Sequence, residues 1–594
     1  MKRVILLIIL NLPLSCYNGL SDMYDELGMK VPICVNSSVA VSGDGRGWGN
    51  AFKTIQEAVD AATTSDGDVI WVAGSFNPLG GQTVLINKKI IILGGFTGTE
   101  SRREDLVSSS KTSVTGTADP VFDITASGVV IDNFNFNNKT SGLSIRQNGQ
   151  LYSAEIQNCV FDTNGASGIY IGEGTVNIKD CFFINNPISA VSIDGGNVTI
   201  KNSFFNSNGG AQGSAIILIE DTLSNKTIFL DIDNTLFQSN NVTGSGGALY
   251  IWSNPGDNIT VTIKNSNFKN NSANQYGGAC YFENTDSLTI DNCSFGSSGT
   301  SSAADKNTAR SYGGAIYLKS TFANFVNSKF YSNEAGMSGT EGFGGAIFSG
   351  SASSLTLSSS IISGNRANNS NAWGGGIYTQ GSLAITGSEL KNNYANSAGG
   401  AIYSSSANLY LKNSKVYNNN AEDGGAVYKI GSIFDIINCL FYDNSAVTNG
   451  GAINLSSVTA CNIYLSTFAF NISEFGGVIY GDICVIKFYN SIESANGAYD
   501  QGAFAYFVTG SLEIDYSCYN NSIQNGSVDY KPDAKTGDPK FVNPTGRDFN
   551  LRSDSQCVNT GSNDAKFLPV GITTDLAGNN RKVGTVDMGC YERQ

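Results

Sequence analysis

The chain has 594 residues, of which 69 are glycine and only 14% are charged, and its formal net charge is -14. This charge argues against nucleic acid and anionic lipid surfaces as partners, because a polyanion would be repelled. The chain is longer than one ordinary core needs, yet no shift in composition divides it. We therefore expect one repetitive body rather than several globular domains.

Residues 1–16 are predicted to be a signal peptide. Lys2 and Arg3 precede an apolar run that is too short to span a bilayer. Leu14-Ser15-Cys16 is similar to the end of a bacterial lipoprotein cleavage box, so Cys16 is the lipidation candidate, although Pro13 departs from that pattern and plain secretion stays open. We expect an exported protein, at the outer membrane surface or extracellular, in which residues 17–38 form a tether. The sequence shows no second apolar stretch that would make a transmembrane segment.

Residues 39–84 are predicted to form an amino-terminal cap. Phe52, Ile55, Val59 and Ala62 recur at helical spacing, which is typical of an amphipathic helix. The end of a stacked β body exposes unpaired backbone groups, so we expect this helix to cover it.

Residues 85–530 carry two repeated motifs. The first is a Gly-Gly pair followed by a small residue, an apolar residue and usually a tyrosine. Its copies begin at Gly246, Gly277, Gly313, Gly344, Gly374, Gly399, Gly424, Gly450 and Gly476. The second is an apolar residue, two variable residues and an asparagine. Its copies begin at Phe161, Phe183, Phe205, Phe237, Phe268, Phe330, Leu390, Phe441 and Phe468.

The later copies of the Gly-Gly motif recur every 25 or 26 residues, and the stretches between motifs alternate apolar and polar residues as strands do. Short strands with glycine or asparagine at each corner, and no helical pattern between them, indicate an all-β fold, the right-handed parallel β-helix. The apolar residue of each Gly-Gly motif is expected to lie in the core.

In each Gly-Gly motif, strand alternation turns the aromatic residue that follows this apolar residue outward. We predict that these rings form one column on the surface, as candidate ligand-binding residues: Tyr250, Tyr281, Tyr317, Tyr378, Tyr403, Tyr428 and Tyr480. An exposed column of rings could bind a glycan or a partner protein. The alternative is that the rings stack and stabilise neighbouring strands.

The sequence offers no catalytic residue that we would name. It has no histidine, which removes the commonest general base. Asp231 and Asp233 lie on one face of a predicted strand, with Glu220 and Asp221 a short way upstream, so a Ca²⁺ site is the one cofactor alternative. No cofactor is predicted otherwise, and the ligands of a metal site cannot be assigned.

The twelve cysteines are spread over the chain, and several occupy a position that holds serine in other repeats, which favours a packing role. Cys159 and Cys181 are one short coil apart, so a disulfide between them is open.

The repeated motifs resemble those of the polymorphic outer membrane proteins of chlamydiae, over residues 155–480. The flanks resemble exported bacterial right-handed β-helix proteins of the pectin-lyase-like superfamily, at Trp48-Gly49-Asn50 near one end and at Val586-Asp587-Met588-Gly589 near the other. Residues 531–594 look like the carboxyl-terminal cap module of that group. The resemblance implies display at the cell surface and adhesion, with both motifs taking part.

We therefore predict an exported bacterial surface β-helix, an adhesin that binds a host-cell surface protein or glycan along one face. The insertions at residues 298–312 and 333–343 are candidate binding loops. A Ca²⁺-dependent pectate-type lyase is the alternative, and a passive surface-layer or spacer protein is the third.

Overall fold

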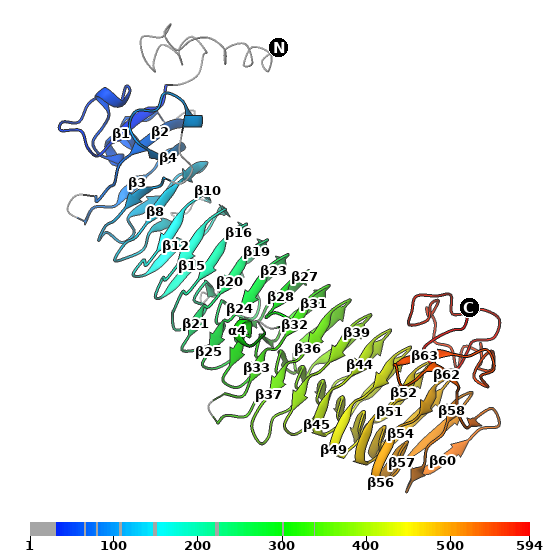
Figure 1. The fold of residues 1–594 in the computed structure, drawn as a ribbon. Helices are drawn as coiled ribbons and strands as arrows, with labels where there is room; N and C mark the ends of the chain where they lie inside the picture. Colours follow the sequence, from blue (N-terminus) through cyan, green and yellow to red (C-terminus); the bar gives the residue numbers. More distant parts are fainter. Residues whose placement is uncertain are drawn as a thin grey trace. The chain divides into compact units, whose positions relative to one another are not determined.

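The computed structural model describes residues 31–63, 67–78, 81–105, 110–146, 151–219, 225–299, 302–337 and 339–594. The predicted signal peptide 1–16, its lipidation candidate Cys16 and most of the predicted tether lie outside these residues. The described chain is almost entirely β, and its stacked strands pair in parallel (Figure 1), which confirms the predicted parallel β-helix. It divides into two units, one reaching residue 209 and including 215–218 and 228–231, the other holding the remainder.

A short helix, α3 (Ile55–Ala61), lies in the amino-terminal cap as predicted. Thr54 and Glu57 form a reciprocal capping box, in which the Thr54 amide donates to the Glu57 carboxylate at 2.9 Å. The helix begins later than its apolar spacing suggests because Phe52 pairs with a strand, donating its amide to Cys34 O at 2.9 Å. Two 3₁₀ turns, η2 (Trp48–Asn50) and η4 (Arg103–Asp105), complete the helical part of this unit that the structure describes.

The predicted tether overlaps a strand. Residues Ile33–Asn36 form β1, which pairs with β2 (Asp68–Ala73), and β2 pairs in turn with β4 (Ile90–Phe96). Cys34 and Val35 are fully buried. Ordered structure therefore starts before residue 39, because β1 supplies the partner that the edge of β2 would otherwise lack.

Three columns of parallel strands build the rest of the first unit. The first holds β7 (Val129–Asp132), β10 (Ser153–Gln157), β13 (Thr175–Lys179) and β16 (Asn197–Lys201). The second holds β3 (Val84–Ile86), β6 (Phe122–Ile124), β9 (Leu143–Ile145), β12 (Ser167–Ile171) and β15 (Ser189–Ile193). The third holds β5 (Thr112–Val114), β8 (Phe134–Phe136), β11 (Val160–Asp162), β14 (Phe182–Ile184) and β17 (Phe204–Asn206).

Each coil of the second unit contributes up to four strands, and we number the columns in the order in which the chain visits them. Column 1 follows each Gly-Gly motif: β22 (Leu249–Trp252), β26 (Cys280–Glu283), β30 (Ile316–Lys319), β34 (Ile347–Ser349), β38 (Ile377–Thr379), β42 (Ile402–Ser405), β46 (Val427–Ile430) and β50 (Ile453–Ser456). Column 2 holds β23 (Asn258–Lys264), β27 (Ser287–Asp291), β31 (Phe322–Val326), β35 (Ser354–Ser358), β39 (Ser382–Thr386), β43 (Leu409–Lys412), β47 (Ile433–Ile437) and β51 (Ala460–Tyr464). The long strands β54 (Ile479–Tyr489) and β57 (Ala505–Asp515) span both columns.

Column 3 carries the asparagine motif: β20 (Leu236–Gln238), β24 (Asn267–Lys269), β28 (Ser294–Phe295), β32 (Lys329–Tyr331), β36 (Ile361–Ser363), β40 (Glu389–Lys391), β44 (Lys415–Tyr417), β48 (Leu440–Tyr442), β52 (Thr467–Ala469), β55 (Ile492–Ser494) and β58 (Cys518–Tyr519). Column 4 holds β21 (Asn241–Val242), β25 (Ser272–Ala273), β29 (Thr308–Ala309), β33 (Glu334–Ala335), β37 (Arg366–Ala367), β41 (Tyr394–Ala395), β45 (Asn420–Asp423), β49 (Ser445–Asn449), β53 (Ile472–Phe475) and β56 (Gly497–Gln501).

Both motifs serve this stacking. Gly424 has φ 61°, a backbone conformation that residues with a side chain rarely adopt. A Cβ on Gly425 would lie 2.2 Å from Gly451 O in the next coil. The motif asparagines form a buried ladder, in which the Asn365 Nδ2 donates to Asn393 Oδ1 at 3.0 Å and to Phe330 O at 3.0 Å. These contacts fix one coil on the next.

Four successive strands of column 1 carry a buried polar residue at the same inward position: Ser349, Thr379, Ser404 and Lys429. Lys429 of β46 is fully buried, and its ammonium donates to Ala407 O at 2.7 Å and to Ile430 O at 2.8 Å. Burial lowers the pKa of Lys429 to about 8. The hydroxyls of Ser404 and Ser349, in the same column, have no hydrogen-bond partner among the residues that the structure describes.

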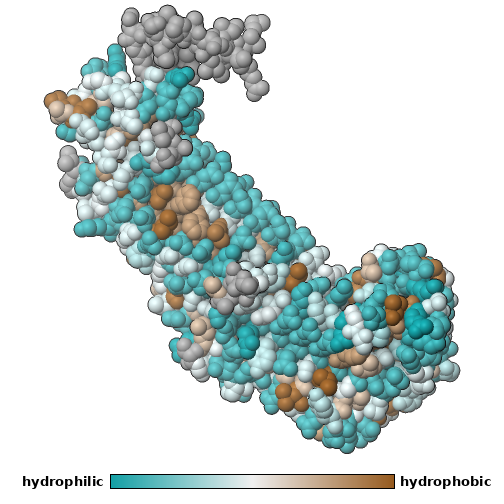
Figure 2. Space-filling model, viewed as in Figure 1, coloured by the Kyte–Doolittle hydropathy of each residue, from teal (hydrophilic) through white to brown (hydrophobic). Residues whose placement is uncertain are grey.

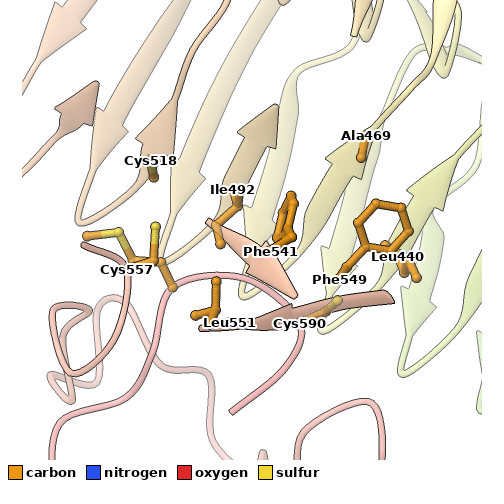
Figure 3. Close-up of a cluster of buried hydrophobic side chains, with 10 residues drawn as sticks. Leu440, Ala469, Ile492, Cys518, Phe541, Phe549, Leu551, Cys557 and Cys590 are labelled. Carbon is orange, nitrogen blue, oxygen red and sulfur yellow. The ribbon is translucent and has the colours of Figure 1, made fainter. Parts of the chain in front are cut away.

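The carboxyl-terminal segment folds back onto the last coils. It contains the antiparallel pair β62 (Phe541–Asn543) and β63 (Asp548–Leu551), whose apolar side chains meet column 3 (Figure 3). The Arg547 guanidinium binds the Asp443 carboxylate through two hydrogen bonds of 2.6 Å. We call residues 538–594 the carboxyl-terminal module.

Candidate functional site

The predicted aromatic column exists, and it is a stack. Neighbouring rings from Tyr250 to Tyr428 lie 4.7 to 5.3 Å apart, centroid to centroid, and nearly parallel, with Phe348 filling the position between Tyr317 and Tyr378. Asn454 occupies the next position of column 1, so Tyr480 is separated from this stack. Tyr480 stacks instead on Tyr506 at 5.6 Å.

A second rank of rings covers the first. The residue just before five of the Gly-Gly pairs is aromatic, at Tyr276, Tyr312, Phe343, Trp373 and Phe475. The first four of these rings pack on the column, and the Trp373 ring lies 5.0 Å from that of Tyr403. Tyr281 and Tyr403 consequently retain only 7% exposure. These aromatic residues before the Gly-Gly pairs are visible in the sequence and could have indicated this cover.

The stacked rings are therefore far less accessible to a ligand than an exposed column of aromatic side chains would be. Burial, with the nearby Glu283 carboxylate, raises the pKa of Tyr250 to about 12, and burial raises that of Tyr317 to about 12. The faces of the inner rings are occupied by their neighbours, so a ligand could not stack on them. This geometry supports the stabilising interpretation, and ligand binding by the column stays a prediction.

A groove lies elsewhere, at the corner between columns 1 and 2. The corner at residues 350–353 has four residues and that at 406–408 has three, whereas the corner between them, at 380–381, has two. Stacked coils with unequal corners leave a recess over the shortest one. The recess has a volume of about 480 Å³.

The groove is neutral and rich in hydroxyls. It is lined by Phe322, Ser351, Ala352, Ser353, Ser354, Ser382, Ser406, Ala407, Asn408 and Ser432. Phe322, Ser354 and Ser382 stand opposite one another on successive strands of column 2. The Ser382 hydroxyl donates to that of Ser354 at 3.1 Å, and the Asn408 amide donates to the Tyr410 hydroxyl at 3.1 Å.

One exposed ring, that of Phe322, lines this polar floor and is 61% exposed. Tyr410 is 39% exposed and lies outside the lining, where its hydroxyl accepts a hydrogen bond from Asn408. The visible face of the protein is mostly hydrophilic, with scattered hydrophobic patches (Figure 2). Sequence reasoning missed Phe322, although alternation with the inward Ala323 and Phe325 indicates that it faces outward.

Two of the four carboxylates weighed for chemistry lie within the described residues. Asp231 and Asp233 share the outer face of β19 (Thr227–Asp233), while Glu220 and Asp221 lie outside the described residues. Within the described ranges, no group of three or more carboxylate, cysteine or histidine side chains is arranged to hold a metal ion. The predicted binding loops are described in part, without residues 300–301 and 338, and the first holds α4 (Ser302–Asp305).

The small and apolar residues of the two motifs face the interior. Ala426 of a Gly-Gly motif and Phe441 and Asn444 of an asparagine motif are all fully buried. These residues pack inside the coil, and participation of the motifs in adhesion stays a prediction.

Comparison with known proteins supports the repeat. Residues 438–456 match the Chlamydia polymorphic membrane protein repeat. The matched segment spans one copy of each motif, Phe441 to Asn444 and Gly450-Gly451-Ala452-Ile453, which confirms the resemblance drawn from them. Across the described part of the chain, no helix is both long enough and apolar enough to span a membrane.

No curated protein matches the chain. A solved structure described as Geobacillus virus E2 ORF18 is 12% identical, with a TM-score of 0.15. The similarity covers 84% of this chain and 65% of that one, so this chain spans less than two thirds of its length. A TM-score this low carries no argument about function.

Proposed function

We propose that this protein is an exported surface adhesin that binds neutral carbohydrate in the corner groove. The single observation that supports this most is the pairing of an exposed ring, Phe322, with an uncharged floor of hydroxyl and amide groups. Sugar rings present apolar faces to aromatic side chains and hydroxyls to polar ones. The lining contains no charged side chain in a protein of net charge -14, which favours a neutral ligand over an acidic one.

Display at the cell surface is part of the same proposal. It is supported by the predicted signal peptide and by the match at residues 438–456 to a repeat of chlamydial membrane proteins. The groove is shallow, so we expect weak binding at each site, strengthened when many copies on one cell engage many ligands.

The test is a glycan array probed with the full-length protein, followed by titration of any neutral glycan that binds. Phe322→Ala should lower affinity about fivefold to tenfold, the value of one aromatic contact. Phe182→Ala is the matched control, since Phe182 is also exposed, at 45%, but lies outside the groove. Equal losses in the two variants, or no binding by the parent protein, would overturn the proposal.

The same assay separates the alternatives. The array is run with and without Ca²⁺, and acidic polysaccharides are followed for release of unsaturated uronides. Ca²⁺-dependent release would support the lyase instead. Neither binding nor release would support a passive spacer.

A further inference from the structure

Two buried cysteines meet where the carboxyl-terminal module docks. Cys518 begins β58 in column 3, and Cys557 belongs to the module. Both are fully buried free cysteines, and they pack in one cluster of buried side chains. Figure 3 shows the Cys557 side chain directed toward Cys518. The neighbouring Gln556 Nε2 lies 3.5 Å from the Cys518 sulfur, which places this stretch of the module directly against β58.

This pair differs in topology from the other pair in contact. Cys159 and Cys181 also meet, but they occupy equivalent positions in successive coils that strand pairing already joins, β11 with β14. Cys518 and Cys557 join two parts that the parallel ladder does not connect. The module is held there by side-chain contacts, such as the packing of Phe549 and Leu551 on column 3.

We propose that Cys518 and Cys557 form a disulfide that locks the carboxyl-terminal module onto the last coils. The oxidant is a small or protein disulfide of the thiol-exchange class. One cysteine thiolate attacks the oxidant and releases one thiol, and the other then attacks the mixed disulfide and releases the second. Two protein thiols are oxidised to one disulfide while one oxidant disulfide is reduced to two thiols. The proposal rests on the proposed export only for the compartment in which it happens.

Burial sets the order of events. Contact with Cys557 and burial both raise the pKa of the Cys518 thiol, which disfavours the attacking thiolate once the module has docked. The bond should therefore form while the module docks, before both thiols are fully enclosed. Once made, it should resist external reductants, because neither sulfur is exposed.

The experiment uses the full-length chain, refolded from denaturant in buffers of reduced and oxidised glutathione. Free thiols are blocked with N-ethylmaleimide, and peptides are mapped without reduction. We expect a peptide linking Cys518 to Cys557 as the main product and an alkylated Cys34, which is buried alone in β1. Complete alkylation of Cys518 and Cys557 at the most oxidising ratio, or a statistical mixture of cysteine pairs, would overturn the proposal.

A second measurement compares the stability of the oxidised and reduced parent protein, so that the test does not depend only on a variant that could misfold. Oxidised parent protein should unfold at a higher denaturant concentration than reduced protein, and Cys557→Ser should abolish that difference. A difference that survives in Cys557→Ser would assign it to another pair and count against this one. Glycan binding is measured on both redox forms. The groove spans residues 322–432, away from both cysteines, so a failure to bind glycan would leave the disulfide result intact. Failure to form the disulfide would likewise leave the glycan-binding result intact.

Discussion

The Gly-Gly motif yields the sharpest test, because two nearby glycines separate its two physical requirements. Gly425 is the second glycine of a motif, and an alanine Cβ there would lie 2.2 Å from Gly451 O and 2.4 Å from Ser445 O. Gly431 sits at a corner with φ 62°, and its Cβ would meet nothing nearer than Ser406 Cα at 3.9 Å. The first position is limited by space and the second by backbone angle.

The expected costs differ severalfold. At Gly431, alanine in the left-handed region costs about 1 to 2 kcal/mol, offset by about 0.4 to 1 kcal/mol from a less flexible unfolded chain. At Gly425, both obstructing oxygens are backbone atoms of the next coil, so relief requires the coils to separate. The Gly425 amide donates to Gly450 O at 3.0 Å, and such ladder bonds would be lost at about 1 kcal/mol each. We expect a total above about 4 kcal/mol, in the range of severe core disruption.

Urea unfolding of Gly425→Ala, Gly431→Ala and the parent protein, followed by circular dichroism, measures this difference. Hydrogen exchange adds a local readout, since the coils at 419–456 should lose protection in Gly425→Ala. Equal midpoint shifts for the two variants would refute the steric argument. So would a Gly425→Ala protein within 1 kcal/mol of the parent.

Two further predictions concern the core. Burial lowers the pKa of Lys429 from 10.5 to about 8, so keeping this ammonium charged in the folded protein costs about 3 kcal/mol of stability below pH 8. This cost should disappear as pH rises from 8 to 10.5, so the parent protein should gain stability over that window. Lys429→Met should flatten this rise, and an unchanged pH profile in the variant would contradict the lowered pKa of Lys429. Asn365→Ala should cost at least about 3 kcal/mol, because Phe330 O loses the Asn365 Nδ2 donor and the Asn333 N and Nδ2 donors lose Asn365 Oδ1 as their acceptor. Asn396→Ala, at an exposed site, should stay within about 0.5 kcal/mol in the same urea titration, and similar losses at both positions would argue against the ladder.

Much of the fold could be predicted because each coil repeats the same local requirements. Strand alternation correctly assigned Ile377 and Ile402 to the core. The same alternation turns Lys429 inward, although a charged residue is not expected in a core. The cap helix could be predicted from its spacing, although its first turn could not. Phe52 pairs with β1, a strand in the segment expected to be a tether.

The candidate site was less predictable, for reasons that concern pairs of coils. The tyrosine column was placed correctly on the outer side of column 1, but its exposure depended on Trp373 and Phe343, which reach it from the turn before each Gly-Gly pair. The groove depends on a difference in corner length between neighbouring coils. Neither the exposure of the tyrosines nor the recess left by unequal corners is defined until the coils are stacked in register.

The sequence by itself determined the period, the parallel β-helix and the inward or outward side of each strand residue, because these follow from steric demands that recur within every coil. The tertiary structure alone decided which outward residues reach solvent and which distant ones meet. Tyr403 became buried, Phe322 stayed exposed beside the groove, and Cys518 met Cys557. Those outcomes depend on distances across coils and across the docked module, which spacing along the chain does not encode.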